Sequence, residues 1–271
     1  MTIDGLPSLR TVFISDIHLG YRGCQADYLH HFLKNLKTDT LVLVGDIVDL
    51  WSLKRSVYWP SQHQAILKEI FELVKRGTRV IYIPGNHDDP ARSLDGALLA
   101  GVEVHRQWIF ESASGHRFWV VHGDEFEGAV KFSWLLKVVG ERLYDSLMVI
   151  GRLIQKTRRR LGLGHWSLAS WIKSRVPDAR TFIDRFEQAA VAAAAKRLCD
   201  GVICGHMHVP QMRVIDGIQY INDGDWVEHC TALVEDRNGR LALIEWTDSI
   251  KTLAVSEASG LAHDLNFQSA A

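Results

Sequence analysis

The sequence predicts an α/β fold with mixed sheets, and two features of the chain support this prediction. Short apolar runs rich in β-branched residues alternate with helical patterns in the first part of the chain, as in α/β proteins. Short strands joined by tight turns follow, which indicates that antiparallel strands complete the sheets. With 271 residues, 47% of them hydrophobic, the chain is long enough to bury a sizeable core.

The expected elements follow in chain order. Buried strands are expected at 11–15, 41–44, 80–83, 118–121 and 201–204, where apolar runs end in polar or glycine-rich segments. Helices are expected at 26–36, at 62–76, where Gly77 stops the pattern, and at 179–197. Further strands are expected at 211–214, 218–221, 231–234 and 241–246, with hairpin turns at Asp216-Gly217 and Asn238-Gly239. Residues 1–247 are then one domain, and the polar segment 248–271 is expected to be a flexible C-terminal tail.

Composition excludes several classes of protein. The first ten residues lack the apolar core of a signal peptide, and no stretch reaches the roughly 18 consecutive apolar residues of a spanning helix. The four cysteines form neither CxxC pairs nor a dense framework, so reduced thiols are expected. These observations predict a cytoplasmic protein, and they leave its oligomeric state open.

The nearly neutral total charge conceals an uneven distribution. The window 131–180 holds eleven basic and three acidic residues, so it carries +8 while the rest of the chain carries −9. We interpret 130–180 as a helical cap inserted into the domain, because both of its ends return to the same core. Its charge indicates an anionic partner for this segment.

Chemically active side chains follow five of the expected strands. Strand ends at the same edge of an α/β sheet bring such residues together in one crevice. Each signal is weak alone, but their repetition in one position relative to the strand predicts a shared metal site. The residues in question are Asp16, His18, Asp46, Asn86, His87, His122, His206 and His208.

The types of ligand narrow the choice of metal. Carboxylates, imidazoles and one amide oxygen suit Mn²⁺, Fe or Zn²⁺ better than the all-oxygen sites of Ca²⁺ and Mg²⁺. Without His87, which is not counted as a ligand, the seven candidate ligands exceed the needs of one tetrahedral ion, and they suffice for two ions if one carboxylate bridges them. Two cations about 3.5–4 Å apart lower the pKa of a shared water and contact both the attacking and the leaving oxygen at phosphorus.

These motifs resemble the calcineurin-like metallophosphoesterase superfamily over about residues 10–210. The matching motifs are Asp16-x-His18, Gly45-Asp46-x-x-Asp49, Gly85-Asn-His-Asp88, His122 and Gly205-His-x-His208. The resemblance implies a four-layer αββα sandwich with a dinuclear metal centre. It implies that one metal takes Asp16, His18, Asp46 and His208, and the other Asp46, Asn86, His122 and His206.

Two further residues have implied roles. His87 is adjacent to the ligand Asn86 and can donate a proton or hydrogen bond to the phosphate or the leaving oxygen. In the family pattern Asp49 orients that histidine, and the alternative for Asp49 is a carboxylate at a helix N-terminus. Asp88 and Asp124 have no assigned task and are expected to be surface turn acids.

Within the superfamily, the sequence resembles the UDP-2,3-diacylglucosamine diphosphatases of lipid A synthesis. The resemblance rests on Ser15-Asp-Ile-His-Leu19, on the helical insertion and on Gly224-Asp225-Trp226. It implies hydrolysis of UDP-2,3-diacylglucosamine to 2,3-diacylglucosamine 1-phosphate and UMP, with Mn²⁺. The chain departs from that group at His87, where the group usually has Arg, so a paralogue acting on another lipid-linked or nucleotide phosphodiester stays open.

The basic cap fits a lipid-linked substrate or an anionic membrane surface, because it mixes apolar and aromatic residues with Lys and Arg. Candidate substrate-binding residues there are Trp134, Arg152, Arg158, Arg159 and Trp166. One alternative for the cap is that it packs its apolar face on the domain and leaves its charges in solvent. An alternative for the protein is a nuclease, although no nucleic-acid partner is expected. A fold that has lost its chemistry is a third alternative, and the complete ligand set argues against it.

Overall fold

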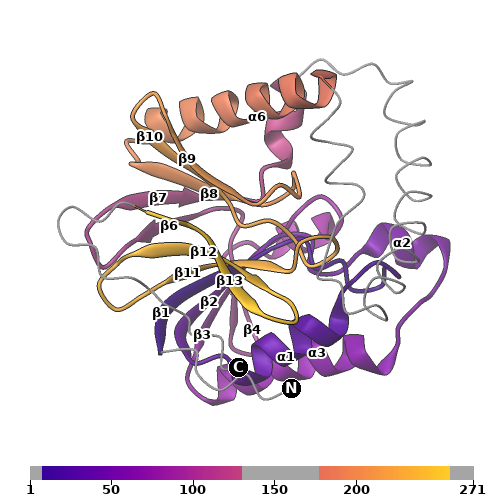
Figure 1. Cartoon of the computed structure of the whole chain (residues 1–271). Coiled ribbons are helices and arrows are strands. Elements are labelled where there is room, and N and C mark those ends of the chain that lie inside the picture. The colour runs from indigo at the N-terminus through magenta and orange to yellow at the C-terminus, as the bar shows by residue number, and fades with distance from the viewer. Residues whose placement is uncertain (1–7, 130–176, 257–271) are drawn as a thin grey trace.

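Two mixed β-sheets lie face to face between layers of helices (Figure 1). The computed structural model describes residues 8–129 and 177–256, and the following statements concern these two ranges. The larger sheet has eight strands in the order β13-β12-β11-β1-β2-β3-β5-β4, and the smaller has five in the order β6-β7-β8-β10-β9.

The central strands of the larger sheet are parallel, and antiparallel strands extend it on both sides. Its strands are β1 (Leu9–Ile14), β2 (Thr38–Val44), β3 (Arg79–Ile83), β4 (Leu98–Leu99), β5 (Val102–Val104), β11 (Thr231–Glu235), β12 (Leu241–Trp246) and β13 (Ile250–Val255). Those of the smaller sheet are β6 (Trp108–Glu111), β7 (Arg117–Val120), β8 (Gly201–Cys204), β9 (Gln211–Ile215) and β10 (Ile218–Asn222).

Helices cover the outer faces of both sheets. Helices α1 (Ala26–Asn35) and α3 (Ser61–Lys75) pack on the larger sheet, and α6 (Pro177–Lys196) packs on the smaller one (Figure 1). Short helical segments are α2 (Leu50–Arg55) and the 3₁₀ turns η1 (Asp89–Leu94) and η2 (Asp124–Ala129). The order helix, sheet, sheet, helix is the αββα sandwich that the sequence predicts.

Three separate apolar clusters explain why the sandwich has four layers. The first, which includes Leu29, Phe32 and Ile70, fills the space between the larger sheet and helices α1 and α3. The second joins the inner faces of the two sheets, and the third packs α6 on the smaller sheet. Strands β1, β2 and β3 contribute to two clusters at once, which is why they are apolar on both faces rather than alternating.

Most predicted elements are confirmed, with boundaries that differ by at most three residues at either end. The turn at Asp216-Gly217 joins β9 and β10, and both residues have positive φ, as a tight hairpin turn requires. The sequence missed the short strands β4, β5 and β6. The expected cap at 130–180 lies outside the described residues up to residue 176, and α6 begins at Pro177.

The prediction of a flexible tail from residue 248 is wrong for its first part. Strand β13 pairs antiparallel with β12, with an irregularity between Leu243 and Ile244. The polar residues Lys251 and Thr252 interrupt the apolar pattern by which a strand is recognised in the sequence. An edge strand can carry such residues, because part of its surface lies in solvent. Ile250 and Ala254 pack against two different apolar clusters. Residues 257–271 lie outside the described residues.

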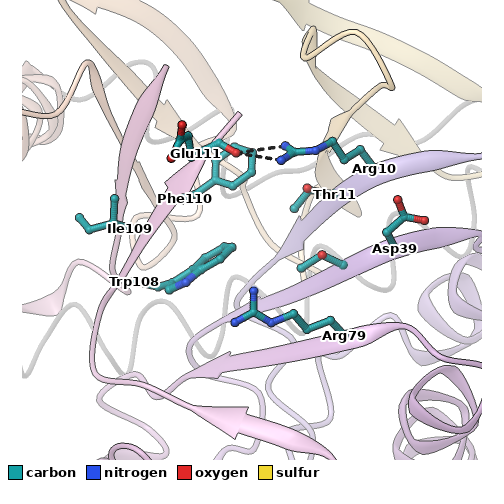
Figure 2. Close-up of a pocket in the computed structure, with 9 residues that line it drawn as sticks. Arg10, Thr11, Asp39, Arg79, Trp108, Ile109, Phe110 and Glu111 are labelled. Carbon is teal, nitrogen blue, oxygen red and sulfur yellow. Dashed lines mark hydrogen bonds between the residues drawn. The ribbon is translucent and has the colours of Figure 1, made fainter. Parts of the chain in front are cut away.

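A cavity of 380 Å³ lies at the amino ends of β1, β2 and β3 (Figure 2). Its arginines already have partners: Arg10 contacts Glu235 at 2.7 Å, and Arg79 contacts Glu103 at 2.7 Å. The predicted metal ligands follow the opposite, carboxyl ends of the same strands. This cavity is therefore not the predicted site.

Two predictions made from the composition can be compared with the structure of the described residues: the state of the cysteines and the character of the helices. All four cysteines are free thiols, as the sequence predicts. Within 8–129 and 177–256, no helix is long and apolar enough to cross a membrane.

Candidate metal centre

The carboxyl ends of five strands from both sheets meet at one edge of the sandwich. Loops after β1, β2 and β3 of the larger sheet and after β7 and β8 of the smaller sheet carry the predicted ligands. The structure brings six of these side chains into two groups whose ligand atoms lie within 4.8 Å of one another. The groups are Asp16, His18 and His208, and Asp46, His122 and His206.

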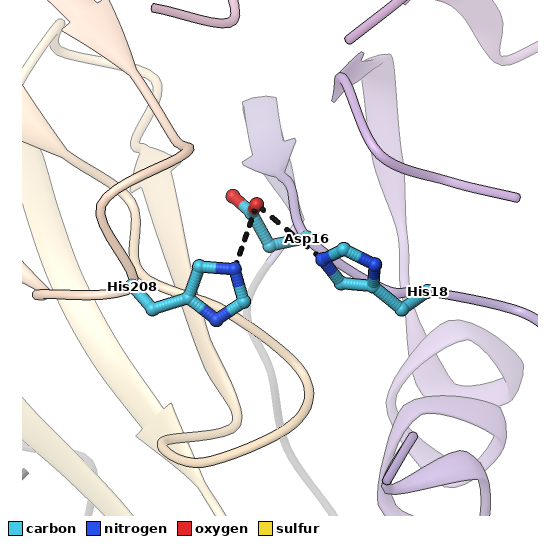
Figure 3. A group of neighbouring side chains, drawn as sticks. All are labelled: Asp16, His18 and His208. Carbon is cyan, nitrogen blue, oxygen red and sulfur yellow. Dashed lines mark ion pairs between the residues drawn. The ribbon is translucent and has the colours of Figure 1, made fainter. Parts of the chain in front are cut away.

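The first group surrounds the Asp16 carboxylate (Figure 3). Asp16 Oδ1 lies 3.1 Å from His208 Nε2 and 3.7 Å from His18 Nε2. Asp16 is fully buried, so its charge faces these two imidazoles rather than water. One carboxylate and two imidazoles with converging atoms form a suitable site for a transition metal.

Asp46 lies between the two groups. Its Oδ2 atom is 3.4 Å from His122 Nε2 and 3.7 Å from His18 Nε2, so one oxygen faces a histidine of each group. His122 Nδ1 lies 2.9 Å from the Val44 carbonyl oxygen, which makes Nδ1 the donor and leaves Nε2 for a metal. This arrangement is the one that a bridging carboxylate needs.

Buried polar atoms without partners test whether these residues fit metal ions. His18 Nε2, His122 Nε2 and the Asn86 side-chain oxygen are buried and have no hydrogen-bond partner. Such atoms are costly in a folded protein unless something else satisfies them. Because all three belong to the predicted ligand set, the residues fit a pair of divalent cations.

The backbone of the ligand loops adopts an unusual conformation. Five predicted ligands have left-handed φ values between 49° and 66°, namely Asp16, His18, Asp46, His206 and His208. Non-glycine residues rarely adopt this region, and they cluster there at functional sites because surrounding contacts enforce the strain. Gly45 has φ +85°, and a Cβ there would overlap the His122 ring, so the close approach of these two loops requires glycine.

Hydrogen bonds fasten the ligand loops to one another. The Asp16 amide donates to the Gly45 carbonyl at 3.0 Å, and the His18 amide to the Asp46 carbonyl at 2.9 Å. Across the sandwich, the His206 amide donates to Asp16 Oδ2 at 2.8 Å. The two sheets are thus tied together through a ligand carboxylate.

Asp49 combines the two roles considered for it. It is the N-cap of α2 and accepts a hydrogen bond from the Ser52 amide at 2.7 Å. Its carboxylate also lies 3.0 Å from His87 Nδ1 and 3.3 Å from His18 Nδ1. Because the buried Asp49 carboxylate contacts the Nδ1 atoms of both His18 and His87, the Nε2 atoms of these two rings point toward the centre.

The prediction that Asp88 is a surface turn acid is wrong. Its carboxylate is 2% exposed and accepts backbone hydrogen bonds from Gly85 at 2.5 Å and Ile47 at 2.7 Å, with longer ones from Asp46 and Val48. Amides of two ligand loops need a common acceptor there, because loop N–H groups buried without one are costly. Asp124 is also only partly exposed and pairs with Arg92 at 2.6 Å.

Close charges alter the pKa values of the central groups. Burial alone would lower the pKa of His18, but contacts with Asp16 and Asp49 raise it to about 10. Burial alone would raise the pKa of the Asp46 carboxyl, but His122 and His18 hold it well below its usual range. Metal binding must displace protons from such imidazoles, because only a neutral imidazole binds a cation.

Sequence reasoning missed three residues around the centre. Asp225 is buried, and its Oδ2 lies 4.0 Å from His208 Nδ1 and 2.6 Å from His229 Nδ1. Glu127 Oε1 lies 2.9 Å from His206 Nε2. The Trp51 ring lies 4.2 Å from the His87 ring, centroid to centroid, at 31°. Only Asp225 had a signal, because the sequence resemblance includes it without giving it a role.

The candidate substrate-binding residues of the cap cannot be placed. Trp134, Arg152, Arg158, Arg159 and Trp166 all lie outside the described residues. The metal-ligand and catalytic roles of the other residues stay predictions, now with a geometry that suits them.

Fold and centre together define a metal-dependent phosphoesterase. Residues 9–210 match the family model described as calcineurin-like phosphoesterase. This match covers most of the chain, and the chain belongs to that family.

Similar proteins were found both by sequence and by structure. The chain is 32% identical over 130 residues to a UDP-2,3-diacylglucosamine hydrolase of Porphyromonas gingivalis, with 45% of this chain and 48% of the relative covered. It spans about half the length of this curated relative. Among solved structures it is similar to Yfce, a phosphoesterase from E. coli (TM-score 0.49, 14% identity, 91% of this chain and 97% of that chain). Vacuolar Protein Sorting 29 from Cryptosporidium parvum has a TM-score of 0.46 at 14% identity, covering 92% and 97%. At these identities the structural likeness concerns the fold and says nothing of substrate.

We expect Asp88→Asn to destabilise the fold. The asparagine replaces one acceptor oxygen by an NH₂ group that faces backbone donors, which costs about 1–3 kcal/mol in the free energy of unfolding. Urea unfolding with EDTA present measures this loss without metal effects. The control is Asp89→Asn, one residue along the chain, whose side chain is 64% exposed. Equal stability of the two variants would contradict the assigned role.

We expect Asp225→Asn to weaken metal binding. Asparagine keeps one oxygen for the backbone amides of Val227 and Glu228, but it loses the carboxylate that faces His208. Loss of a hydrogen-bonded partner lowers metal affinity by about 10–100-fold; at 4.0 Å Asp225 acts on His208 through its charge, so we expect a loss of about tenfold or less. Calorimetric titration with Mn²⁺ measures the effect, with Asp216→Asn in the exposed β9–β10 turn as the control. Unchanged Mn²⁺ affinity would show that Asp225 serves only its own loop.

Proposed function

We infer that this chain hydrolyses a diphosphate or phosphodiester bond in a lipid-linked nucleotide substrate. The proposed reaction converts UDP-2,3-diacylglucosamine and water to 2,3-diacylglucosamine 1-phosphate and UMP. The observation that carries the proposal is the pair of side-chain groups that could each hold a metal ion, with Asp46 facing both and His87 beside them. This is the arrangement that phosphoryl transfer needs, because its catalysis is mainly positioning and charge stabilisation.

The residues that would hold two divalent cations follow from the geometry and the resemblance. Asp16, His18, Asp46 and His208 would hold one, and Asp46, Asn86, His122 and His206 the other. Bound there, the cations supply positive charge against the phosphate oxygens and a water of lowered pKa. Mn²⁺ is the proposed metal, and Fe and Zn²⁺ have the same ligand preferences.

His87 is held so that one ring nitrogen is available for the substrate. Asp49 contacts its Nδ1, the Trp51 ring lies against its face, and its Nε2 lies 4.0 Å from Asp46 Oδ2. The His87 amide also donates to Asp46 Oδ1 at 2.9 Å. Nε2 is then positioned to donate a hydrogen bond or a proton to the phosphate or to the leaving oxygen.

The lipid-linked substrate is supported by the 32% identity to a UDP-2,3-diacylglucosamine hydrolase and by the basic, aromatic composition of 130–180. In this proposal the segment shelters the acyl chains and contacts an anionic membrane surface from the cytoplasmic side.

A second candidate function is a paralogous phosphodiesterase acting on another nucleotide or lipid-linked ester. His87 favours it, since the diphosphatase group usually has Arg there.

Variants at the centre separate metal binding from proton donation. We expect Asp46→Ala and His122→Ala to abolish hydrolysis of bis-p-nitrophenyl phosphate with Mn²⁺, because each removes a ligand. His87→Ala should lower the turnover by about 10²–10⁴-fold and keep both metals, as loss of a general acid does. Elemental analysis counts the metals, and His105→Ala is a control outside the centre. Fewer than one metal per wild-type chain would contradict the dinuclear site.

The substrate is tested by the release of UMP. We expect UDP-2,3-diacylglucosamine to be hydrolysed with a much higher kcat/KM than UDP-sugars without acyl chains. Each buried CH₂ group contributes about 0.8 kcal/mol, so two acyl chains give a large difference. Equal rates on both substrates would remove the lipid from the proposal and leave the paralogous phosphodiesterase.

A further inference from the structure

The segment 222–226 contains the motif Gly224-Asp225-Trp226, to which the sequence resemblance gives no role. The segment follows β10 of the smaller sheet and leads to β11 of the larger one. Asn222, its first residue, pairs with Cys204 at the end of β8, and its last residue contacts the loop after β1. The segment therefore crosses from one sheet to the other beside the ends of two strands that precede predicted metal ligands.

The Asn222 side chain fastens the loop that carries His206 and His208. Its Nδ2 donates to the Gly205 carbonyl oxygen at 2.6 Å, and its Oδ1 accepts from the Gly224 amide at 3.0 Å. Asn222 is fully buried, so water is not at hand to replace either hydrogen bond. The position of Gly205, directly before His206, therefore depends on this side chain.

The same segment fastens the loop that carries Asp16. Ser15 Oγ donates to Asp223 Oδ1 at 2.6 Å and lies 3.2 Å from the Gly224 carbonyl oxygen. The Trp226 amide donates to the Asp16 carbonyl oxygen at 3.1 Å. Asp16 is thus held both through its own backbone and through the side chain of the residue before it.

A close approach at Gly205 leaves the two loops no space to adjust. A Cβ at this position would overlap Ser15 Oγ and Asp16 Oδ2, so the loops touch each other where the segment holds both. On its other side, the Asp223 carbonyl oxygen accepts from Thr231 Oγ1 at 2.7 Å, at the start of β11. The segment is anchored to the larger sheet in this way, and a shift of the segment would move both ligand loops.

We propose that Asn222 and Asp223 are positioning residues of the metal centre. Neither belongs to the predicted ligand set, and both hold the backbone from which Asp16, His206 and His208 reach the metals. Ligands that are already held in place bind a cation more tightly, because binding does not have to order them. This inference rests on the metal-dependent hydrolysis of the proposed function and is independent of the lipid.

The two metal sites should depend on this segment to different degrees. Two ligands of the first set, Asp16 and His208, stand on the loops that the segment holds (Figure 3). Only His206 of the second set does so, and Asp88 fastens the ligand loops after β2 and β3. Loosening the segment should therefore weaken the first site more than the second.

Calorimetric titration with Mn²⁺ tests the proposal without a measurement of activity. We expect Asn222→Ala and Asp223→Ala to lower the affinity of the first site by about three- to tenfold, less than the roughly 10–100-fold loss for a partner of a ligand side chain. Asp223→Asn keeps Oδ1 for Ser15 and should retain the wild-type affinity. His18→Ala and Asn86→Ala assign the steps of the titration, because each removes a ligand of one set only.

The matched control is Thr78→Ala. Thr78 Oγ1 is buried and donates to the Thr38 carbonyl oxygen at 3.0 Å, at the amino ends of β2 and β3. Loss of this hydrogen bond should lower the stability in urea with EDTA and leave both Mn²⁺ affinities unchanged. The absorption spectrum of the Co²⁺-loaded protein, which reports the geometry of the ligands, should change in Asn222→Ala and stay the same in the control.

The proposal fails if Asn222→Ala and Asp223→Ala lose only stability and keep both Mn²⁺ affinities, or if the two sites weaken equally. An equal loss of affinity in Asp223→Asn and Asp223→Ala would also overturn it, because the charge of Asp223 would then act on the metals. If Asn222→Ala does not fold, Ser15→Ala removes a single hydroxyl from the same network and should weaken the first site alike.

Failure of this proposal can be told apart from failure of the proposed function. A wild-type chain that binds two Mn²⁺ ions and hydrolyses no phosphoester would reject the proposed function, and the affinities of the variants would still decide the role of the segment. Normal hydrolysis together with unchanged affinities in all the variants would reject the positioning role alone.

Discussion

The burial of two carboxylates at the junction of the two sheets is the constraint on which the rest of the structure depends. Asp16 is fully buried and Asp46 is 2% exposed. An isolated buried carboxylate is very costly, so each must be surrounded by cationic groups or hydrogen-bond donors. Imidazoles from both sheets supply this environment, and divalent cations would supply it more strongly. The left-handed ligand residues, the glycine at position 45 and the buried Asp88 all serve to bring those imidazoles close.

The layered architecture explains how the constraint is met. Three apolar clusters hold the four layers together, and dense packing of this kind limits the movement of the strand ends relative to one another. The loops can then store backbone strain, because the packed sheets resist its release. The hydrogen bond from the His206 amide to Asp16 makes the centre itself part of the contact between the sheets. A cation bound at Asp16 would therefore also stabilise the sandwich.

Much of the fold and the centre could be predicted from the sequence, because the same apolar runs that predict the strands also locate the residues that follow the strand ends. Apolar runs predict strands, and the carboxyl ends of parallel strands meet at one edge, so the residues after Ile14, Val44 and Ile83 had to converge. What failed depends on contacts between distant segments. Asp88 looks like a turn acid until the Ile47 amide, 41 residues earlier, is placed beside it. No sequence pattern around Glu127 predicts its contact with His206. Strand β13 is recognisable only once β12 is known to be there for it to pair with.

The histidine at position 87 changes what the protein itself contributes to the proposed reaction. An arginine there would carry a permanent charge and donate hydrogen bonds, but its very high pKa prevents it from releasing a proton at neutral pH. An imidazole in general can release one, and in the proposed reaction the contact of Asp49 with Nδ1 leaves Nε2 as the donating nitrogen. Asp49 is itself fixed as the N-cap of α2, and the first turn of this helix carries Trp51 against the His87 ring. One short helix therefore holds His87 and its carboxylate partner together. In the proposed reaction, histidine instead of arginine at this one position of the motif thus adds a group that can transfer a proton.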